Sequence, residues 1–210
     1  TLHDTKTTES CRELFNNASV CTHIYASGQQ LMNENIFPKM EYESIALEIR
    51  RMYEMDQDMR ERTLENQGVI ENEEDEKLDE YNTEQMKEIV ARIGWPTLSK
   101  VGEEISHMAW LLVQHADQDA VFQRYCLGLM RQEAEYEVSK KDIAYLEDRV
   151  RVNEGKPQLY GTQFFGEGDA YGPRPIEDIE YLDRRREVMG MEPMEEYRKN
   201  LIEKYKGFST

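Results

Sequence analysis

Apolar residues that recur at steps of three and four are the feature of this sequence that most restricts its fold. In the segment from residue 44 to about residue 62, they are Ile45, Ile49, Met52 and Met59. Such spacing places the side chains on one side of a helix and is typical of an amphipathic helix that packs on a core. Because the same period continues through most of the chain, we expect a predominantly all-α fold.

The helical period predicts a bundle made of several further helices. We expect them over residues 82–94, 99–138, 140–152, 175–190 and 193–207. The last two each begin at a proline and end at a glycine, which is the usual order of these residues in helices. The sequence therefore predicts an N-terminal arm over residues 1–41 and a single helical domain over residues 42–207.

One segment inside the predicted domain interrupts the helical pattern. Residues 155–175, GKPQLYGTQFFGEGDAYGPRP, contain five glycines and four aromatic residues. This composition is too irregular for a helix and too aromatic for a plain linker, and it predicts a long loop with a small hairpin around residues 158–165. We expect the loop to form a lid or a wall of a pocket.

The charge of the chain restricts its partners. It has 26 Lys and Arg against 43 Asp and Glu residues, a formal net charge of −17. Such a charge repels nucleic acid and anionic lipid, so neither nucleic acid nor a membrane is an expected partner. No apolar run approaches the roughly 20 residues that span a bilayer. A small-molecule substrate, neutral or basic, is the expected ligand, and the oligomeric state stays open.

The three cysteines leave the location of the protein open. Cys11 and Cys21 bracket Asn17, which begins an Asn-Ala-Ser glycosylation sequon. In a secreted or endomembrane protein the two cysteines could form a disulfide. The alternative is a cytoplasmic protein with reduced thiols and a chance sequon. Cys126 lies on an apolar stripe, so we expect it to pack as a small hydrophobic residue and not to act as a nucleophile.

Ionisable residues interrupt the apolar stripes of three predicted helices. His115 and Asp119 lie one turn apart in WLLVQHADQD, Asp56 and Arg60 lie one turn apart in YEMDQDMR, and YLEDRV contains Asp148 and Arg149. Burying an ionisable group without a partner costs several kcal/mol, so these side chains need partners. Asp119 is one candidate partner of His115, and a residue of another helix is the other.

These insertions predict a polar site in the bundle. Histidine exchanges protons most readily near neutral pH, so His115 is the expected general acid or base. Asp119 or Asp148 would orient it, and arginine would hold an oxygen of the substrate. We expect a hydrolase, lyase, isomerase or cyclase that needs no cofactor. The alternative is a non-catalytic, acidic binding or interaction protein whose polar core only fixes the register of the helices.

A metal site is a third possibility. The spacing of His115 and Asp119 would allow both to bind one ion, as in a metal-dependent hydrolase or oxygenase. The sequence has no HExxH motif, no Glu-x-x-His pair and no cysteine cluster to support it. No metal is therefore expected, and His115 with Asp119 would be the ligands if one were bound.

Six phrases together resemble a known family. They are DQDMR, GWPTLSKVG, WLLVQHADQDAVFQ, YLEDRV, QLYGTQF and PIEDIEYLDRRREVMGMEPMEEY, in this order between residues 42 and 197. The chain is similar through them to a family of bacterial and fungal proteins that share a domain of unknown function. The resemblance implies a shared fold and shared polar residues, and it implies no reaction.

Most of the polar residues identified from periodicity lie in these phrases. Combining both arguments, we expect a catalytic group of His115, Asp119 and Asp148. The expected substrate-binding group is Asp56, Gln57, Arg60, Asp117, Gln123, Arg149, Tyr160 and Gln163.

Overall fold

The computed structural model describes residues 38–66, 73–166 and 171–205. The chain divides into two compact units, Thr1–Ser44 and Ile45–Thr210. Of the first unit, the described residues 38–44 are helical and begin a helix that covers residues 38–65. Cys11, Asn17 and Cys21, on which the disulfide and sequon hypotheses depend, lie outside the described residues. The unit from Ile45 onward carries the site and is described below.

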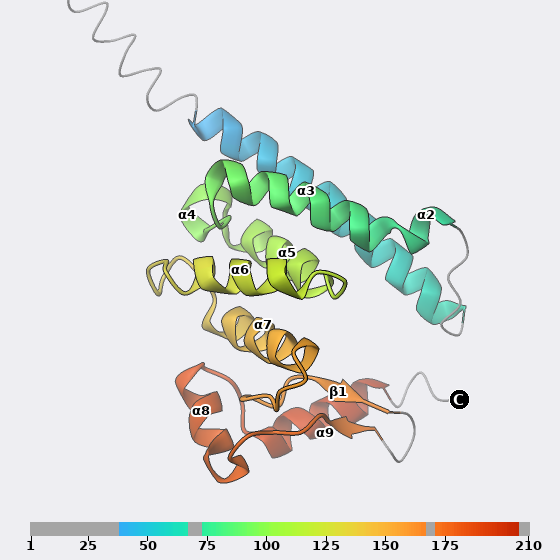
Figure 1. Ribbon diagram of the computed structural model, residues 1–210, viewed down its shortest axis with the longest axis vertical. Coiled ribbons are helices and arrows are strands. Elements are labelled where there is room, and N and C mark those ends of the chain that lie inside the picture. The colour runs from blue at the N-terminus through green and yellow to red at the C-terminus, as the bar shows by residue number, and fades with distance from the viewer. Residues whose placement is uncertain (1–37, 67–72, 167–170, 206–210) are drawn as a thin grey trace, which may run out of the picture. The chain divides into compact units, whose positions relative to one another are not determined.

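This unit is predominantly helical, as predicted (Figure 1). After the helix that ends at residue 65, the described elements are α2 (Glu73–Glu76), α3 (Leu78–Ile93), α4 (Leu98–Val101), α5 (Glu103–Gln114), α6 (Ala120–Met130), α7 (Lys140–Asn153), β1 (Phe164–Phe165), β2 (Gly172–Pro173), the 3-10 helix η2 (Ile179–Tyr181), α8 (Leu182–Val188) and α9 (Met194–Tyr205). The antiparallel pair β1 and β2 is the small sheet, with Phe164 opposite Pro173. The loop predicted from its glycines and aromatic residues thus contains a small antiparallel pair, but this pair joins residues 164–165 to residues 172–173 and does not lie within the predicted range of 158–165.

Helix α5 lies at the centre of the bundle. It contacts α3, α4, α6 and α7, and α6 also packs on α7. Its apolar side chains belong to a continuous buried cluster to which the first helix contributes Ile45, Ile49 and Met52. The periodic apolar residues of the sequence therefore form the core. Cys126 of α6 is fully buried in this cluster, and burial raises the pKa of its thiol, so it packs as a hydrophobic residue as predicted.

The predicted long helix over residues 99–138 is wrong, because the chain turns twice within it and α6 ends at Met130, eight residues before the predicted end. Gly102 has a φ of +86°, a conformation that favours glycine, and it separates α4 from α5. A second turn over residues 115–119 separates α5 from α6. There the amide N–H of Asp119 donates to Ala116 O at 3.0 Å, and that of Asp117 donates to His115 O at 2.9 Å. His115 is therefore the C-terminal cap of α5 and not a residue in mid-helix.

The start of α3 also differs from the prediction. The helix begins at Leu78, four residues before Asn82, and Asn82 is buried inside it. It ends at Ile93, before Gly94, where the end was predicted. The acidic residues before Asn82, which lie ahead of the predicted start of the helix, therefore form α2 and the first turn of α3.

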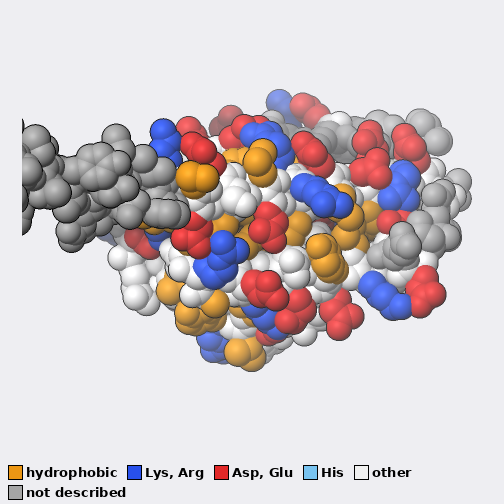
Figure 2. Space-filling model, turned by 90° about the horizontal axis from the view of Figure 1, so that it is seen from above, with side chains coloured by type: hydrophobic (Ala, Val, Ile, Leu, Met, Phe, Trp, Pro, Cys, Tyr) orange, Lys and Arg blue, Asp and Glu red, His pale blue; other side chains and the backbone are white. Residues whose placement is uncertain are grey.

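None of the described helices is both long enough and apolar enough to cross a lipid bilayer. On the face shown in Figure 2, basic side chains lie among the acidic ones, with hydrophobic side chains between them. The acidic side chains are therefore not gathered into one acidic patch on this face.

Candidate functional site

His115 meets the helix of residues 38–65 where the chain leaves α5. Its Nδ1 atom lies 2.9 Å from Oδ1 and 3.1 Å from Oδ2 of Asp56. The carboxylate of Asp56 is fully buried, whereas the imidazole of His115 is 18% exposed. Because a carboxylate only accepts hydrogen bonds, this contact requires a proton on Nδ1 of His115. The other ring nitrogen, Nε2, has no hydrogen-bond partner within the described part of the chain.

Arg60 and Gln57 complete the surroundings of Asp56. Nε of Arg60 lies 3.1 Å from Oδ1 of Asp56 and 3.0 Å from Nδ1 of His115. Its single N–H can donate to either atom, and it donates to Oδ1 of Asp56 when Nδ1 of His115 carries a proton. Nε2 of Gln57 donates to Oδ2 at 2.7 Å. Burial alone would raise the pKa of Asp56, but the hydrogen bonds and charges of His115 and Arg60 outweigh it and lower this pKa. Asp56 is therefore held as an anion.

Asp79, in the first turn of α3, binds the other side of Arg60. Its Oδ1 lies 2.6 Å from Nη2 of Arg60. Burial raises the pKa of Asp79, and the charges of Asp56 and Asp117 raise it further, against the opposing effect of Arg60 and His115. Asp79 was not among the predicted site residues, because it lies before residue 82, where the helix was predicted to begin. The signal was present, because Leu78 precedes Asn82 and Met86 at four-residue steps and extends the helical period back to Asp79.

A second group of polar side chains surrounds Asp117, two residues after His115. Nη1 of Arg149, from α7, lies 3.2 Å from Oδ2 of Asp117. Nδ2 of Asn153 donates to Oδ1 of Asp117 at 2.9 Å and to Oε1 of Gln123 at 2.9 Å. Gln123 also donates to the carbonyl oxygens of Val113 and Gln114, at 3.1 and 3.3 Å, and is fully buried. Gln123 thus ties the end of α5 to α6, and Asn153 is a further site residue that periodicity did not identify.

The predicted pairing of Asp119 with His115 is wrong. Oδ1 of Asp119 accepts from the amide N–H of Phe122 at 2.9 Å and caps α6. Its Oδ2 lies 2.8 Å from Nζ of Lys87. The turn at residues 115–119 removes Asp119 from the helix face on which the pairing was based. For the same reason His115 and Asp119 do not form the pair of metal ligands considered above.

Asp148 does not orient His115 either. It is fully buried, and its carboxylate accepts from the amides of Leu159, Tyr160 and Thr162 at 2.6–3.2 Å, and from Oγ1 of Thr162 at 2.9 Å. Burial raises the pKa of Asp148, and these hydrogen bonds oppose the increase. Asp148 therefore holds the loop after α7 in place.

Tyr160 and Gln163 belong to this loop and not to the group around His115. The carbonyl oxygen of Tyr160 accepts from the fully buried Arg186 at 2.6 Å, and Nε2 of Gln163 donates to Oγ1 of Thr162 at 2.9 Å. Between them, Gly161 has a φ of +69°, and a Cβ atom there would lie 3.0 Å from Sδ of Met194. The YGTQ phrase therefore serves the packing of the loop on α8 and α9.

The residues from 43 to 209 match the model of DUF6624, a family of unknown function. The chain belongs to this family. A search of curated proteins and a search of solved structures each gave no match. The DUF6624 match covers the residues around His115 and those around Asp148 alike, so it assigns no role to either group.

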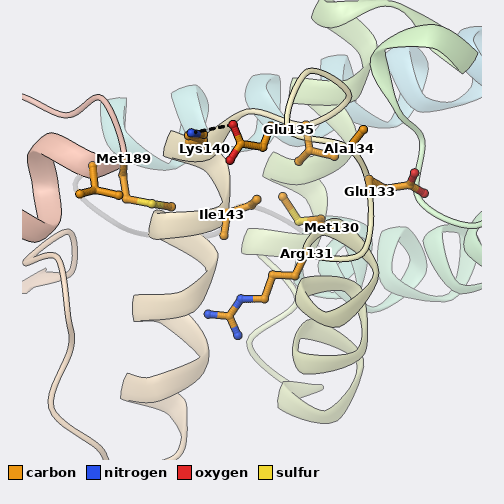
Figure 3. A pocket seen from close by; sticks show the side chains of 10 residues that line it. Met130, Arg131, Glu133, Ala134, Glu135, Lys140, Ile143 and Met189 are labelled. Atoms are coloured by element: carbon orange, nitrogen blue, oxygen red, sulfur yellow. Dashed lines mark ion pairs between the residues drawn. The ribbon is translucent and has the colours of Figure 1, made fainter.

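A pocket of the DUF6624 domain lies elsewhere, between the end of α6, the start of α7 and the end of α8 (Figure 3). It has a volume of about 240 Å³, and Met130, Ile143 and Met189 are among its apolar residues. Lys140 and Glu135 at its edge form an ion pair of 3.1 Å. Its lining contains none of the polar residues that were predicted to form a site.

The described part of the DUF6624 domain contains no group of three or more His, Cys, Asp or Glu side chains arranged to hold a metal ion. The acidic residues near His115 bind arginines instead: Asp56 and Asp79 bind Arg60, and Asp117 binds Arg149. What the arrangement offers chemically is an imidazole in contact with the guanidinium group of Arg60, with a second guanidinium, that of Arg149, bound to Asp117 two residues further along the chain.

Proposed function

We propose that this protein is an enzyme that acts on a small molecule by general acid–base chemistry, without a cofactor, and that His115 transfers the proton. The observation that carries the proposal is the contact of 2.9 Å between Nδ1 of His115 and the fully buried carboxylate of Asp56. A carboxylate behind a histidine fixes its tautomer and orientation and stabilises the imidazolium that forms during proton transfer. Asp56 takes the orienting role that was predicted for Asp119 or Asp148.

Each residue has a defined task in this proposal. Nε2 of His115 takes a proton from the substrate or from water, and returns it to a leaving or rearranging group. Asp56 keeps Nδ1 protonated throughout. Arg60, fixed between Asp56 and Asp79, donates to an oxygen of the substrate on which negative charge develops. Hydrolase, lyase, isomerase and cyclase reactions all fit these tasks.

The loop after α7 acts as a wall in this proposal and not as a moving lid. Four donors of the segment from Leu159 to Thr162 bind Asp148. Nε of Arg185 in α8 also donates to the carbonyl oxygen of Leu159 at 2.7 Å. A segment with this many internal hydrogen bonds opens only at a high cost in free energy.

The test compares the wild-type protein with His115→Asn on p-nitrophenyl esters, phosphate esters and glycosides and on a set of metabolites followed by mass spectrometry. Asparagine keeps an N–H that can donate to Asp56, so the fold is preserved, which circular dichroism checks. We expect turnover to fall by about 10²–10⁴-fold, the usual contribution of a general acid or base. Turnover that is equal in both proteins would contradict the proposal.

A second readout needs no substrate. Diethyl pyrocarbonate acylates the unprotonated nitrogen of an accessible histidine, which in this proposal is Nε2 of His115. We expect peptide mapping to show rapid modification of His115 in the wild type and slower modification in Asp56→Asn, where the carboxylate no longer fixes the tautomer. A His115 that resists the reagent in the folded wild type would contradict the proposal.

The alternative function, a non-catalytic binding protein with a structural polar core, is favoured by one observation. Asp56, buried between two segments 59 residues apart, accepts from three side chains of its own chain. In that case the network fixes helix register, and the wild type and His115→Asn would turn over none of the tested substrates at different rates.

A further inference from the structure

Arg149 is the least satisfied cation of the candidate site. Its side chain is 29% exposed, and Nη1 lies 3.2 Å from Oδ2 of Asp117. Nε of Arg149 is buried and has no hydrogen-bond partner. Within the described residues, Nη2 of Arg149 also has no partner. A guanidinium group has five N–H donors, so most of its hydrogen-bonding capacity is unused.

The surroundings of Arg149 add positive charge. Burial is the largest effect that lowers its pKa, and Arg60 and Arg174 lower it further, whereas Asp117 raises it. Arg60 contacts His115, and Arg174 lies in the loop with its guanidinium 5.1 Å from the centre of the Phe165 ring. Arginines of two other segments thus act on Arg149, and one of them, Arg60, contacts His115.

The carboxylates of the site are already occupied. Asp56 accepts from Gln57, Arg60 and His115, and is fully buried. Oδ1 of Asp79 binds Arg60, and both oxygens of Asp117 are bound, Oδ2 by Arg149 and Oδ1 by Asn153. Each carboxylate of the site thus already binds at least one donor, whereas Nε of Arg149 binds no acceptor. A ligand that complements the site must bring acceptors.

We infer that Arg149, together with Arg60, binds an oxyanion of the substrate, a carboxylate or a phosphate group, and holds it beside Nε2 of His115. The inference rests on the proposed function and adds the substrate class to it. Asp117 fixes the position of Arg149, because the ion pair between them engages Nη1 and leaves Nη2 to the ligand. Guanidinium groups bind planar carboxylates and phosphates through two parallel hydrogen bonds.

An anionic substrate differs from the neutral or basic ligand that the composition favours. The net charge of −17 favours a neutral or basic ligand at long range. Salt screens charges beyond about 8–10 Å, so an ion near Arg149 responds mainly to the local arginines. The acidic surface of the protein would lower the association rate of an anion without removing its site.

The test measures the binding of inorganic phosphate and of acetate by calorimetry at constant ionic strength, with ethylammonium as a cationic control. The proteins compared are the wild type, Arg149→Gln and Arg184→Gln, because Arg184 is an exposed arginine of α8. We expect one of the two anions to bind the wild type with a millimolar dissociation constant, and about tenfold more weakly to Arg149→Gln. Arg184→Gln should bind like the wild type.

The two anions distinguish the two kinds of substrate group. Phosphate that binds more tightly than acetate indicates a phosphate group, and the reverse indicates a carboxylate. Binding of neither anion, equal binding by Arg149→Gln, or binding of ethylammonium instead would overturn the inference. Two controls separate loss of the site from loss of the fold. The circular dichroism spectrum of Arg149→Gln should match that of the wild type, and Arg149→Lys should retain part of the anion binding.

The outcome is separable from that of the proposed function. His115→Asn should keep the anion affinity of the wild type within about threefold, because the oxyanion contacts are made by arginine. If the anion binds and turnover does not depend on His115, the proposed function fails alone. If turnover depends on His115 and no anion binds, the present inference fails alone.

Discussion

Nδ1 of His115 and Oδ1 of Asp56 lie 2.9 Å apart, although 59 residues separate them in the sequence. The pair joins the C-terminal end of α5 to the helix of residues 38–65. Because Asp56 is fully buried, its charge is stable only while His115 and Arg60 donate to it. The pair therefore contributes to the stability of the fold as well as to the chemistry proposed for the site.

We predict that Asp56→Asn lowers the free energy of unfolding at neutral pH by about 1.5–3 kcal/mol, the value of hydrogen bonds to a buried charge. The pKa of Asp56 is lowered in the folded protein, so its contribution is present above the unfolded-state pKa of about 4 and is lost as the pH falls through the lower folded value. Urea unfolding of both proteins at several pH values measures this difference.

The control for this prediction is Asp58→Asn on the same helix. Asp58 is 70% exposed and pairs with Arg62 at the surface, so its replacement should leave the stability nearly unchanged. The stability difference between the wild type and Asp56→Asn should be constant from neutral pH down to about pH 5 and should shrink below about pH 4. A difference that persists at low pH would show that the charge of Asp56 is not what stabilises the fold.

Periodicity was sufficient to find the polar residues that interrupt the core. Asp56, Arg60 and His115 stand out because each lies at an apolar position of a local helical period, and a local period can be seen in the sequence. Their partners could not be assigned in the same way. The contact of His115 with Asp56 depends on how two helices pack, and packing is set by the whole core.

The error at Asp119 has a local cause. The turn at residues 115–119 contains neither glycine nor proline, so the sequence offered no strong signal to end the helix. An aspartate that can cap the start of the next helix is a weaker signal of a break, and in this structure Asp119 does cap α6. The all-α class survived this error because α5 and α6 keep their apolar faces toward the same core.

Asp119→Ala tests the new role of this residue. Loss of the hydrogen bond from the amide of Phe122 should lower the free energy of unfolding by about 1 kcal/mol, the usual cost of removing a helix cap. Asp119→Ser keeps a capping oxygen and should recover most of this loss. Thermal and urea unfolding measure both variants. If either variant also lost His115-dependent turnover to the extent of His115→Asn, Asp119 would have to be restored as a partner of His115.

Asp148→Ala is expected to loosen the loop after α7. The substitution leaves the buried amides of Leu159 and Thr162 without an acceptor, and each unsatisfied group costs about 1–3 kcal/mol. Hydrogen exchange at Leu159, Tyr160 and Thr162 should become faster, while exchange in α3 stays protected. Glu180→Ala, at an exposed position of the same region, is the control. Unchanged exchange in Asp148→Ala would contradict the role of Asp148 as the anchor of the loop.

His107 provides a pH-dependent signal outside the candidate site. Its ring stacks on Trp110 with centroids 4.8 Å apart, and Nδ1 lies 3.1 Å from Oδ2 of Asp142. The hydrogen bond to Asp142 raises the pKa of His107 above 6.5, its charge adds to this effect, and burial opposes it. A protonated imidazole quenches the fluorescence of a stacked indole. Fluorescence should therefore increase as the pH rises through a midpoint above 6.5.

Protonation of His107 also stabilises the folded protein. Because the folded pKa of His107 is raised, its contribution is fully present below the unfolded value of about 6.5 and is lost as the pH rises through the folded value. His107→Gln should remove both the fluorescence transition and this part of the pH dependence. Trp95 is buried in the core, so its fluorescence should stay constant over this pH range. A transition that persists in His107→Gln would have to come from another group near one of the two tryptophans.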